Sequence, residues 1–130
     1  MKNTPENITK LESNEIFVFG SNLAGRHGAG AALLALKKFG AISGQGYGLM
    51  GQSYGIATKD ERIQTLSLDR IQVQVNKFLR FAENNPEKIF LVTQIGCGLA
   101  GYSPKDIAPL FKGFSSNVIL PESFSKILNN

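Results

Sequence analysis

The stretch IFVFGSNLAGRHGAGAALLALKKF, residues 16–39, decides the fold, because it predicts a strand, a glycine-rich loop and a helix in immediate succession. Residues 16–19 form a continuous apolar run of β-branched and aromatic residues, which is typical of a strand covered on both faces. Residues 31–39 repeat apolar side chains at helical spacing, and Gly40 suits the position that ends a helix. This succession indicates an α/β protein.

The glycines of this loop, at positions 20, 25, 28 and 30, permit backbone conformations and close approaches that other residues do not. The first N–H groups of the following helix lack intrahelical partners, and the helix dipole is positive there, so main-chain donors alone can hold a phosphate. The spacing matches neither the dinucleotide-binding fingerprint nor the P-loop. Two interpretations stay open: a phosphate cradle of another kind, or a tight turn without a ligand.

A second glycine-rich loop follows a second apolar strand. Residues 89–93 form the strand pattern, and GCGLAG, residues 96–101, comes directly after it. Ser103 and Pro104 suit the N-cap and first position of a helix, which we expect to run through Phe111. Because ligands of parallel sheets bind outside the carboxyl ends of the strands, both glycine loops are expected to face one cleft suited to a diphosphate or a phosphorylated sugar.

The remaining segments predict further alternation of strands and helices. Residues 41–52 are too rich in glycine for a regular helix, and residues 60–65 form a charged loop. Ser67 suits the N-cap of an amphipathic helix. We expect strands at 53–59 and 118–120, helices at 68–84 and 123–128, and a short edge strand near 8–11.

The alternation predicts a three-layer α/β/α fold with a mixed, largely parallel central sheet. We expect one domain over residues 15–130, preceded by a polar segment at residues 1–14. The polar start contains no secretory signal pattern, and no apolar run approaches the length of a membrane span. These features, with Cys97 as the single cysteine, favour a cytoplasmic protein without an intramolecular disulfide.

Composition bounds the function. A net charge of +4 suits an anionic ligand, but the basic residues are scattered and form no run typical of a nucleic-acid-binding arm. An RNA-binding α/β module is therefore a weaker alternative. One histidine and one cysteine make a structural zinc site implausible, and we expect neither a metal nor a cofactor.

Few side chains near the predicted cleft can take part in chemistry. Lys59 pairs with phosphate or forms a Schiff base, or is a solvated lysine at a strand end. His27 is either a base or a surface residue, and Cys97 is either a thiol of lowered pKa or a small residue packed beneath its loop. Asn22 offers a donor and an acceptor to a sugar hydroxyl or serves a turn. Tyr102 borders a ribose or lies in the core.

Three motifs together resemble the macrodomain family, nearest to the branch that removes terminal ADP-ribose from acidic side chains. RHGAG, residues 26–30, is similar to the first ligand loop of the family. Thr58-Lys59 is similar to the end of its middle strand, and IGCGL, residues 95–99, to its second loop. In their order and spacing, the motifs extend the resemblance from residue 16 to about residue 120.

The resemblance implies a macrodomain-like fold that binds ADP-ribose, or a related nucleotide diphosphate sugar, with the pyrophosphate between the loops. It also implies hydrolysis of an ADP-ribose ester or phosphate, with Lys59 as nucleophile or electrostatic partner, and ADP-ribosylated protein or nucleic acid as partners. The ligand-binding residues that follow are Gly20, Ser21, Asn22, Arg26, Gly28, Ala29, Gly30, Ile95, Gly96, Cys97, Gly98, Leu99, Ala100, Gly101 and Tyr102.

Two departures from the family pattern bear on mechanism. The branch places an acidic residue directly after IGCGL, where this chain has Ala100, so Asp60 or Glu61 would have to assist Lys59. No aspartate is evident before the first strand to hold an adenine amine. The alternative function is therefore a non-catalytic reader or sequestering module for a nucleotide signal or an ADP-ribosylated macromolecule.

Overall fold

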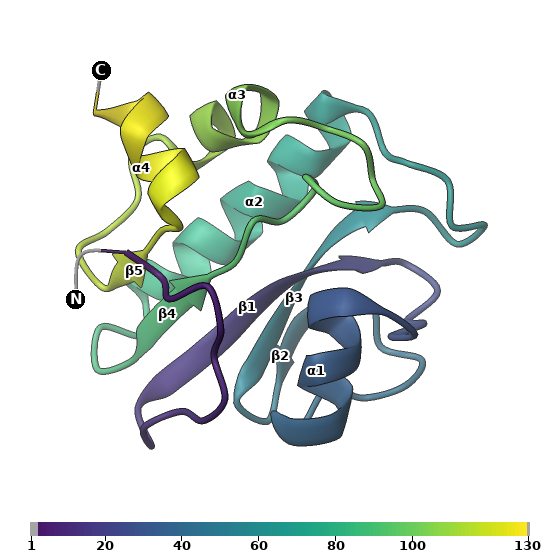
Figure 1. Ribbon diagram of the computed structural model, residues 1–130, viewed down its shortest axis with the longest axis horizontal. Helices are drawn as coiled ribbons and strands as arrows, with labels where there is room; N and C mark the ends of the chain where they lie inside the picture. The colour runs from purple at the N-terminus through teal and green to yellow at the C-terminus, as the bar shows by residue number, and fades with distance from the viewer. Residues whose placement is uncertain (1–2, 130) are drawn as a thin grey trace.

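The computed structural model describes residues 3–129, so residues 1 and 2 of the expected polar segment and residue 130 of the expected domain lie outside it. Helices and strands alternate along the chain, as the sequence predicts (Figure 1). The elements are β1 (Glu15–Asn22), α1 (Gly30–Lys38), β2 (Gly48–Met50), β3 (Ser53–Lys59), α2 (Leu68–Glu83), β4 (Ile89–Val92), α3 (Pro104–Ile107), the 3₁₀-helix η1 (Ala108–Phe111), β5 (Val118–Ile119) and α4 (Glu122–Leu128).

One five-stranded sheet has the strand order β2-β3-β1-β4-β5. β1 pairs in parallel with β3 and with β4, and β4 pairs in parallel with β5, whereas β2 runs antiparallel to β3. The prediction of a mixed, largely parallel sheet is confirmed. The carboxyl ends of the four parallel strands therefore share one edge of the sheet.

Alternate residues of β1 pack into two separate cores, because successive side chains of a strand point to opposite faces. Ile16 and Val18 join the core beneath α2, whereas Phe17 and Phe19 join the core beneath α1. Figure 1 shows α1 and α2 on opposite sides of the sheet. The core on the α2 side also receives the apolar side chains of η1 and α4. β1 is thus the buried centre of the molecule.

The helix α2 begins and ends where its sequence predicts, to within a residue. The Ser67 hydroxyl accepts a hydrogen bond from the Arg70 N–H at 3.3 Å and caps the first turn. A stripe of buried residues, Ile71, Val75, Phe78 and Ala82, faces the sheet. Among residues 3–129, no helix combines the length and the apolarity that crossing a bilayer requires.

Three details differ from the predictions. Residues 8–11 form no edge strand, because Ile8 packs beside Phe17 over the α1 face of the sheet instead of pairing at an edge. The expected helix from residue 104 to 111 changes to 3₁₀ geometry at Ala108, since Pro109 has no N–H to continue an α-helical ladder. The short strand β2 was not predicted, and it forms through its pairing with β3.

Candidate functional site

A cavity of about 490 Å³ lies at the carboxyl ends of β1, β3 and β4. From β1 the chain proceeds to β3 on one side, and it later crosses to β4 on the other side. Such a change of direction is where open α/β sheets bind ligands. Both glycine loops contribute walls, as the sequence predicts. The lining residues are Gly20, Ser21, Asn22, Arg26, Gly28, Ala29, Gly30, Ala31, Ala32, Thr58, Lys59, Ile63, Thr93, Gln94, Ile95, Gly96, Gly98, Leu99 and Ala100.

Asn22 builds the first loop. Its buried side chain donates from Nδ2 to the Arg26 carbonyl at 2.8 Å and accepts the Arg26 N–H on Oδ1 at 3.0 Å. The Gly25 N–H closes the same turn by donating to the Asn22 carbonyl at 3.0 Å. Asn22 lines the cavity, but its amide is largely engaged in holding the loop. The structure therefore assigns it the turn-forming role that the sequence left open.

His27 fastens the first loop to the segment after α1. Its ring is 4% exposed, and Nε2 lies 3.0 Å from the carbonyl oxygens of both Ile42 and Gln45. Since both partners are acceptors, Nε2 carries the proton in this arrangement. The ring also meets Phe19 edge to face at 5.4 Å. His27 is therefore not the surface residue that the sequence allowed, and it does not line the cavity, where a base would have to lie.

The N-terminus of α1 opens onto the cavity without a side-chain cap. Its N-cap residue, Ala29, offers no hydrogen-bonding side chain, and Gly30 has a φ of 56°. The first N–H groups of the helix therefore have no side-chain acceptor there. A buried or half-buried anion in the cavity would satisfy them and would meet the positive end of the helix dipole.

The second loop turns tightly back on itself. Gly101 N–H donates to the Gly98 carbonyl at 3.0 Å, and Tyr102 N–H donates to the Gly96 carbonyl at 2.9 Å. Gly96 has a φ of 74°, and a Cβ there would lie 2.9 Å from Cδ1 of Ile107. The backbone conformation at this position therefore favours glycine, and a Cβ would also press on the buried Ile107 side chain.

Gly28 and Gly98 are glycines for a different reason. Neither has a positive φ, and a Cβ added to either would have no protein atom within 4 Å. They come from the two different loops and line the same cavity. Neither backbone conformation nor protein packing therefore requires glycine at these two positions. Both glycines are exposed where they line the cavity, so the backbone there is open to a ligand.

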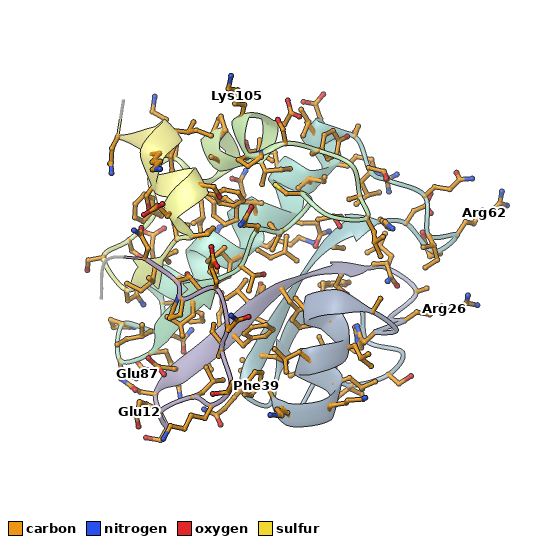
Figure 2. The ribbon with its side chains drawn as sticks, in the orientation of Figure 1. Glu12, Arg26, Phe39, Arg62, Glu87 and Lys105 are labelled. Carbon is orange, nitrogen blue, oxygen red and sulfur yellow. The ribbon has the colours of Figure 1, made fainter. Side chains whose placement is uncertain are left out.

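Two cationic residues are among those that line the cavity, Arg26 from the first loop and Lys59 from the end of β3. Figure 2 shows Arg26 and Arg62 on the same side of the molecule, beyond the carboxyl ends of the strands. Thr58, before Lys59, donates its hydroxyl to the Ser21 carbonyl at 3.2 Å and ties β3 to β1 at this edge. The charge of the cavity therefore favours anions.

Asp60 follows Lys59 but does not line the cavity. Its Oδ1 accepts N–H bonds from Arg62 at 2.8 Å and Gln64 at 3.0 Å. These backbone bonds, that from Gln64 first, lower the pKa of the Asp60 carboxyl. The carboxylate therefore folds the loop that it begins, and in this geometry it does not face the Lys59 end of the cavity as an assisting acid or base.

Three predicted ligand-binding residues of the second loop, Cys97, Gly101 and Tyr102, do not line the cavity. Tyr102 packs against the α2-side core and donates its hydroxyl to the Leu66 carbonyl at 2.7 Å. Burial, and then the carboxylate of Asp106, raise the pKa of the Cys97 thiol to about 11. The structure therefore favours the packing alternatives for Cys97 and Tyr102.

Other lining residues escaped the sequence analysis. Thr93 and Gln94 follow β4 but precede the glycines that marked the loop, and Ile63 lies in a charged loop. No composition signal distinguishes these positions, although the rule that ligands bind beyond strand ends could have drawn attention to Thr93 and Gln94. Ala31 and Ala32 belong to the first turn of α1, whose role at the cavity was predicted without them.

A second cavity of about 700 Å³ adjoins the first, because both are lined by Gly30, Ala31, Thr93 and Gln94. Its other walls come from residues 4–8, from Phe17 and Leu34, and from residues 121–127 around α4. The two cavities therefore lie next to one another, with these four residues at their junction. Within residues 3–129, no group of three or more His, Cys, Asp and Glu side chains is arranged to hold a metal ion.

Comparisons of this chain with protein-family models, with curated proteins and with solved structures gave no match. Function is therefore inferred from the geometry of the two cavities and from the motifs that surround them.

Proposed function

We propose that this chain is a macrodomain-like protein that binds ADP-ribose, or a related nucleotide diphosphate sugar, between its two glycine loops. The observation that carries the proposal is the pair Gly28 and Gly98. Each is an exposed glycine that lines the same cavity, and a Cβ at either position would meet no protein atom within 4 Å. A ligand packed directly against the backbone explains both glycines together.

The polar groups around these glycines suit a diphosphate. The uncapped N-terminus of α1 offers main-chain donors, and Arg26 and Lys59 bring positive charge to the same cavity. A diphosphate between the loops would accept from such donors without needing a metal ligand set. The resemblance of residues 26–30 and 95–99 to macrodomain loops supports the same assignment.

The two adjoining cavities suit the two unequal halves of such a ligand. The junction at Gly30, Thr93 and Gln94 lies beside the loops that would hold the phosphates. The larger cavity, with walls from residues 4–8 and α4, has room for the nucleoside. The terminal sugar then lies at the Lys59 end of the smaller cavity.

Filling the open space tests the proposal. In Gly28→Val and Gly98→Val, the added Cβ meets no protein atom within 4 Å, and neither position has a positive φ. We expect ADP-ribose affinity measured by calorimetry to fall at least about tenfold, close to 1.4 kcal/mol, with thermal unfolding unchanged. Ser116→Val, at an exposed position outside both cavities, serves as the control. Unchanged affinity in both glycine variants would refute the site.

Whether the protein also hydrolyses its ligand is a separate question. Lys59 lines the cavity and is the candidate nucleophile or electrostatic partner. The residue after Leu99 is Ala100, and the Asp60 carboxylate is engaged by the backbone of its own loop. These two observations favour the second candidate function, a reader that binds without turnover.

A turnover assay with ADP-ribose ester-linked to a carboxylate separates the two candidates. Release of free ADP-ribose by the wild type, abolished in Lys59→Ala while binding persists, would support a hydrolase. Binding without release would support the reader. Turnover undiminished in Lys59→Ala would exclude the lysine from the chemistry.

A further inference from the structure

The loop after β3 holds a strained residue in the wall of the cavity. Ile63 has a φ of 63°, and among residues 3–129 it is the non-glycine residue with a positive φ. A β-branched residue in this conformation is a genuine outlier, since its side chain crowds the backbone. Such strain persists only where the surroundings impose it, and it gathers at functional sites.

Hydrogen bonds around Ile63 hold the backbone in this positive-φ conformation. The Asp60 carboxylate accepts the N–H groups on either side, from Arg62 and Gln64, while the Ile63 N–H donates to the Asp60 carbonyl at 3.1 Å. The Asp60 N–H also donates to the Gln64 carbonyl at 2.8 Å. The loop is therefore closed on itself, with Ile63 at its turn.

The same loop is anchored to the opposite wall of the cleft. Thr65 donates its hydroxyl to the Ala100 carbonyl at 3.0 Å, and Tyr102 donates to the Leu66 carbonyl at 2.7 Å. These bonds join residues 60–66 to the second glycine loop. Ile63, which lines the cavity, therefore belongs to a loop that is bonded to the second glycine loop.

We propose that Ile63 is a specificity-determining residue that closes the Lys59 end of the cleft and packs against the terminal sugar of the ligand. The inference rests on the proposed function, which assigns the diphosphate to the glycine loops and the nucleoside to the larger cavity. The terminal sugar then lies beside Lys59 and Ile63, which line the cavity at the carboxyl end of β3. An aliphatic side chain suits the C–H face of a sugar, whereas Lys59 suits its oxygens.

The role of Ile63 is tested by comparing a ligand that has a terminal sugar, ADP-ribose, with one that lacks it, ADP. Calorimetry would measure the binding of both ligands to the wild type and to the variants Ile63→Gly and Ile63→Ala. Glycine tolerates a positive φ, so Ile63→Gly is expected to fold with wild-type thermal stability. Ile63→Ala removes most of the side chain by a different substitution. Ile42→Ala, which truncates an exposed isoleucine outside both cavities, is the matched control.

Both Ile63 variants are expected to lose about tenfold in affinity for ADP-ribose, while their affinity for ADP stays within about twofold of the wild type. The control should match the wild type for both ligands. Equal losses for ADP and ADP-ribose, or an unchanged affinity for ADP-ribose, would overturn the role of Ile63. Failure of the proposed function looks different, because the wild type would then bind neither ligand, and the inference would fall with it.

Discussion

Cys97 stands between two glycines before a helix, a setting that in other proteins activates a thiol. Here burial and the nearby Asp106 carboxylate raise its pKa to about 11 instead. At pH 8 the native thiol is therefore almost fully protonated, whereas a cysteine in the unfolded chain, with a pKa of about 8.5, is partly ionised. Raising the pH towards 11 should restore thiolate and reactivity to the native protein.

Alkylation kinetics test this expectation. At pH 8 we expect iodoacetamide to modify native Cys97 about two orders of magnitude more slowly than the denatured chain, because the thiolate is the reactive form. The native rate should rise steadily with pH between about 8 and 11. Equal native and denatured rates at pH 8 would contradict the raised pKa.

At the scale of single residues, the sequence identified the cavity walls better than the roles of the side chains. Glycines are visible in a sequence, and both glycine loops do line the cavity. The roles of Asn22 and Tyr102 depend on which backbone groups their polar atoms meet. Tyr102 bonds to Leu66, 36 residues away, and no local pattern encodes that partner.

At the scale of elements, the first glycine loop is held in place by the segment after α1. A Cβ on Gly46 would overlap the Asn22 carbonyl oxygen and lie 2.9 Å from the Leu23 Cα, although the φ of Gly46 is not positive. Gly46→Ala must therefore push the two segments apart. We expect the free energy of unfolding to fall by about 2 kcal/mol, measured by urea denaturation.

Gly98→Ala is the matched control, because its Cβ meets open space at an ordinary φ. Its stability should be unchanged or higher by up to about 1 kcal/mol, since alanine restricts the unfolded chain. A loss of stability in Gly46→Ala but not in Gly98→Ala would show that close packing, and not backbone conformation, requires glycine at position 46. A Gly46→Ala variant as stable as Gly98→Ala would contradict the close approach of the two segments.

The elements that the sequence predicted well are those with local signals. Ser67 and the apolar stripe beginning at Ile71 define α2 without help from the rest of the chain. β2 has no such signal, because three residues among many glycines become a strand only through pairing with β3. Ile8 shows the converse, since an edge strand was expected near it but its side chain is buried over the sheet face.

At the scale of the whole molecule, the topology brings the two loops together. β1 lies between β3 and β4, so the loops after β1 and β4 meet at one edge although more than 60 residues separate Gly28 from Gly98. The alternation of strands and helices in the sequence already predicted that both loops would lie at this edge of the sheet. The adjoining second cavity was not predictable, because it needs α4 and residues 4–8 to converge beside α1.

Isothermal titration of ADP-ribose into the wild-type protein, with AMP and ribose-5-phosphate as controls, tests the central claim most directly. A diphosphate between the loops and a nucleoside and sugar on either side predict a Kd near about 1 µM, or about −8 kcal/mol. On this account each control ligand would make only part of the contacts of ADP-ribose and should bind far more weakly. No heat from ADP-ribose at millimolar concentration, with no competition against any nucleotide, would contradict the claim.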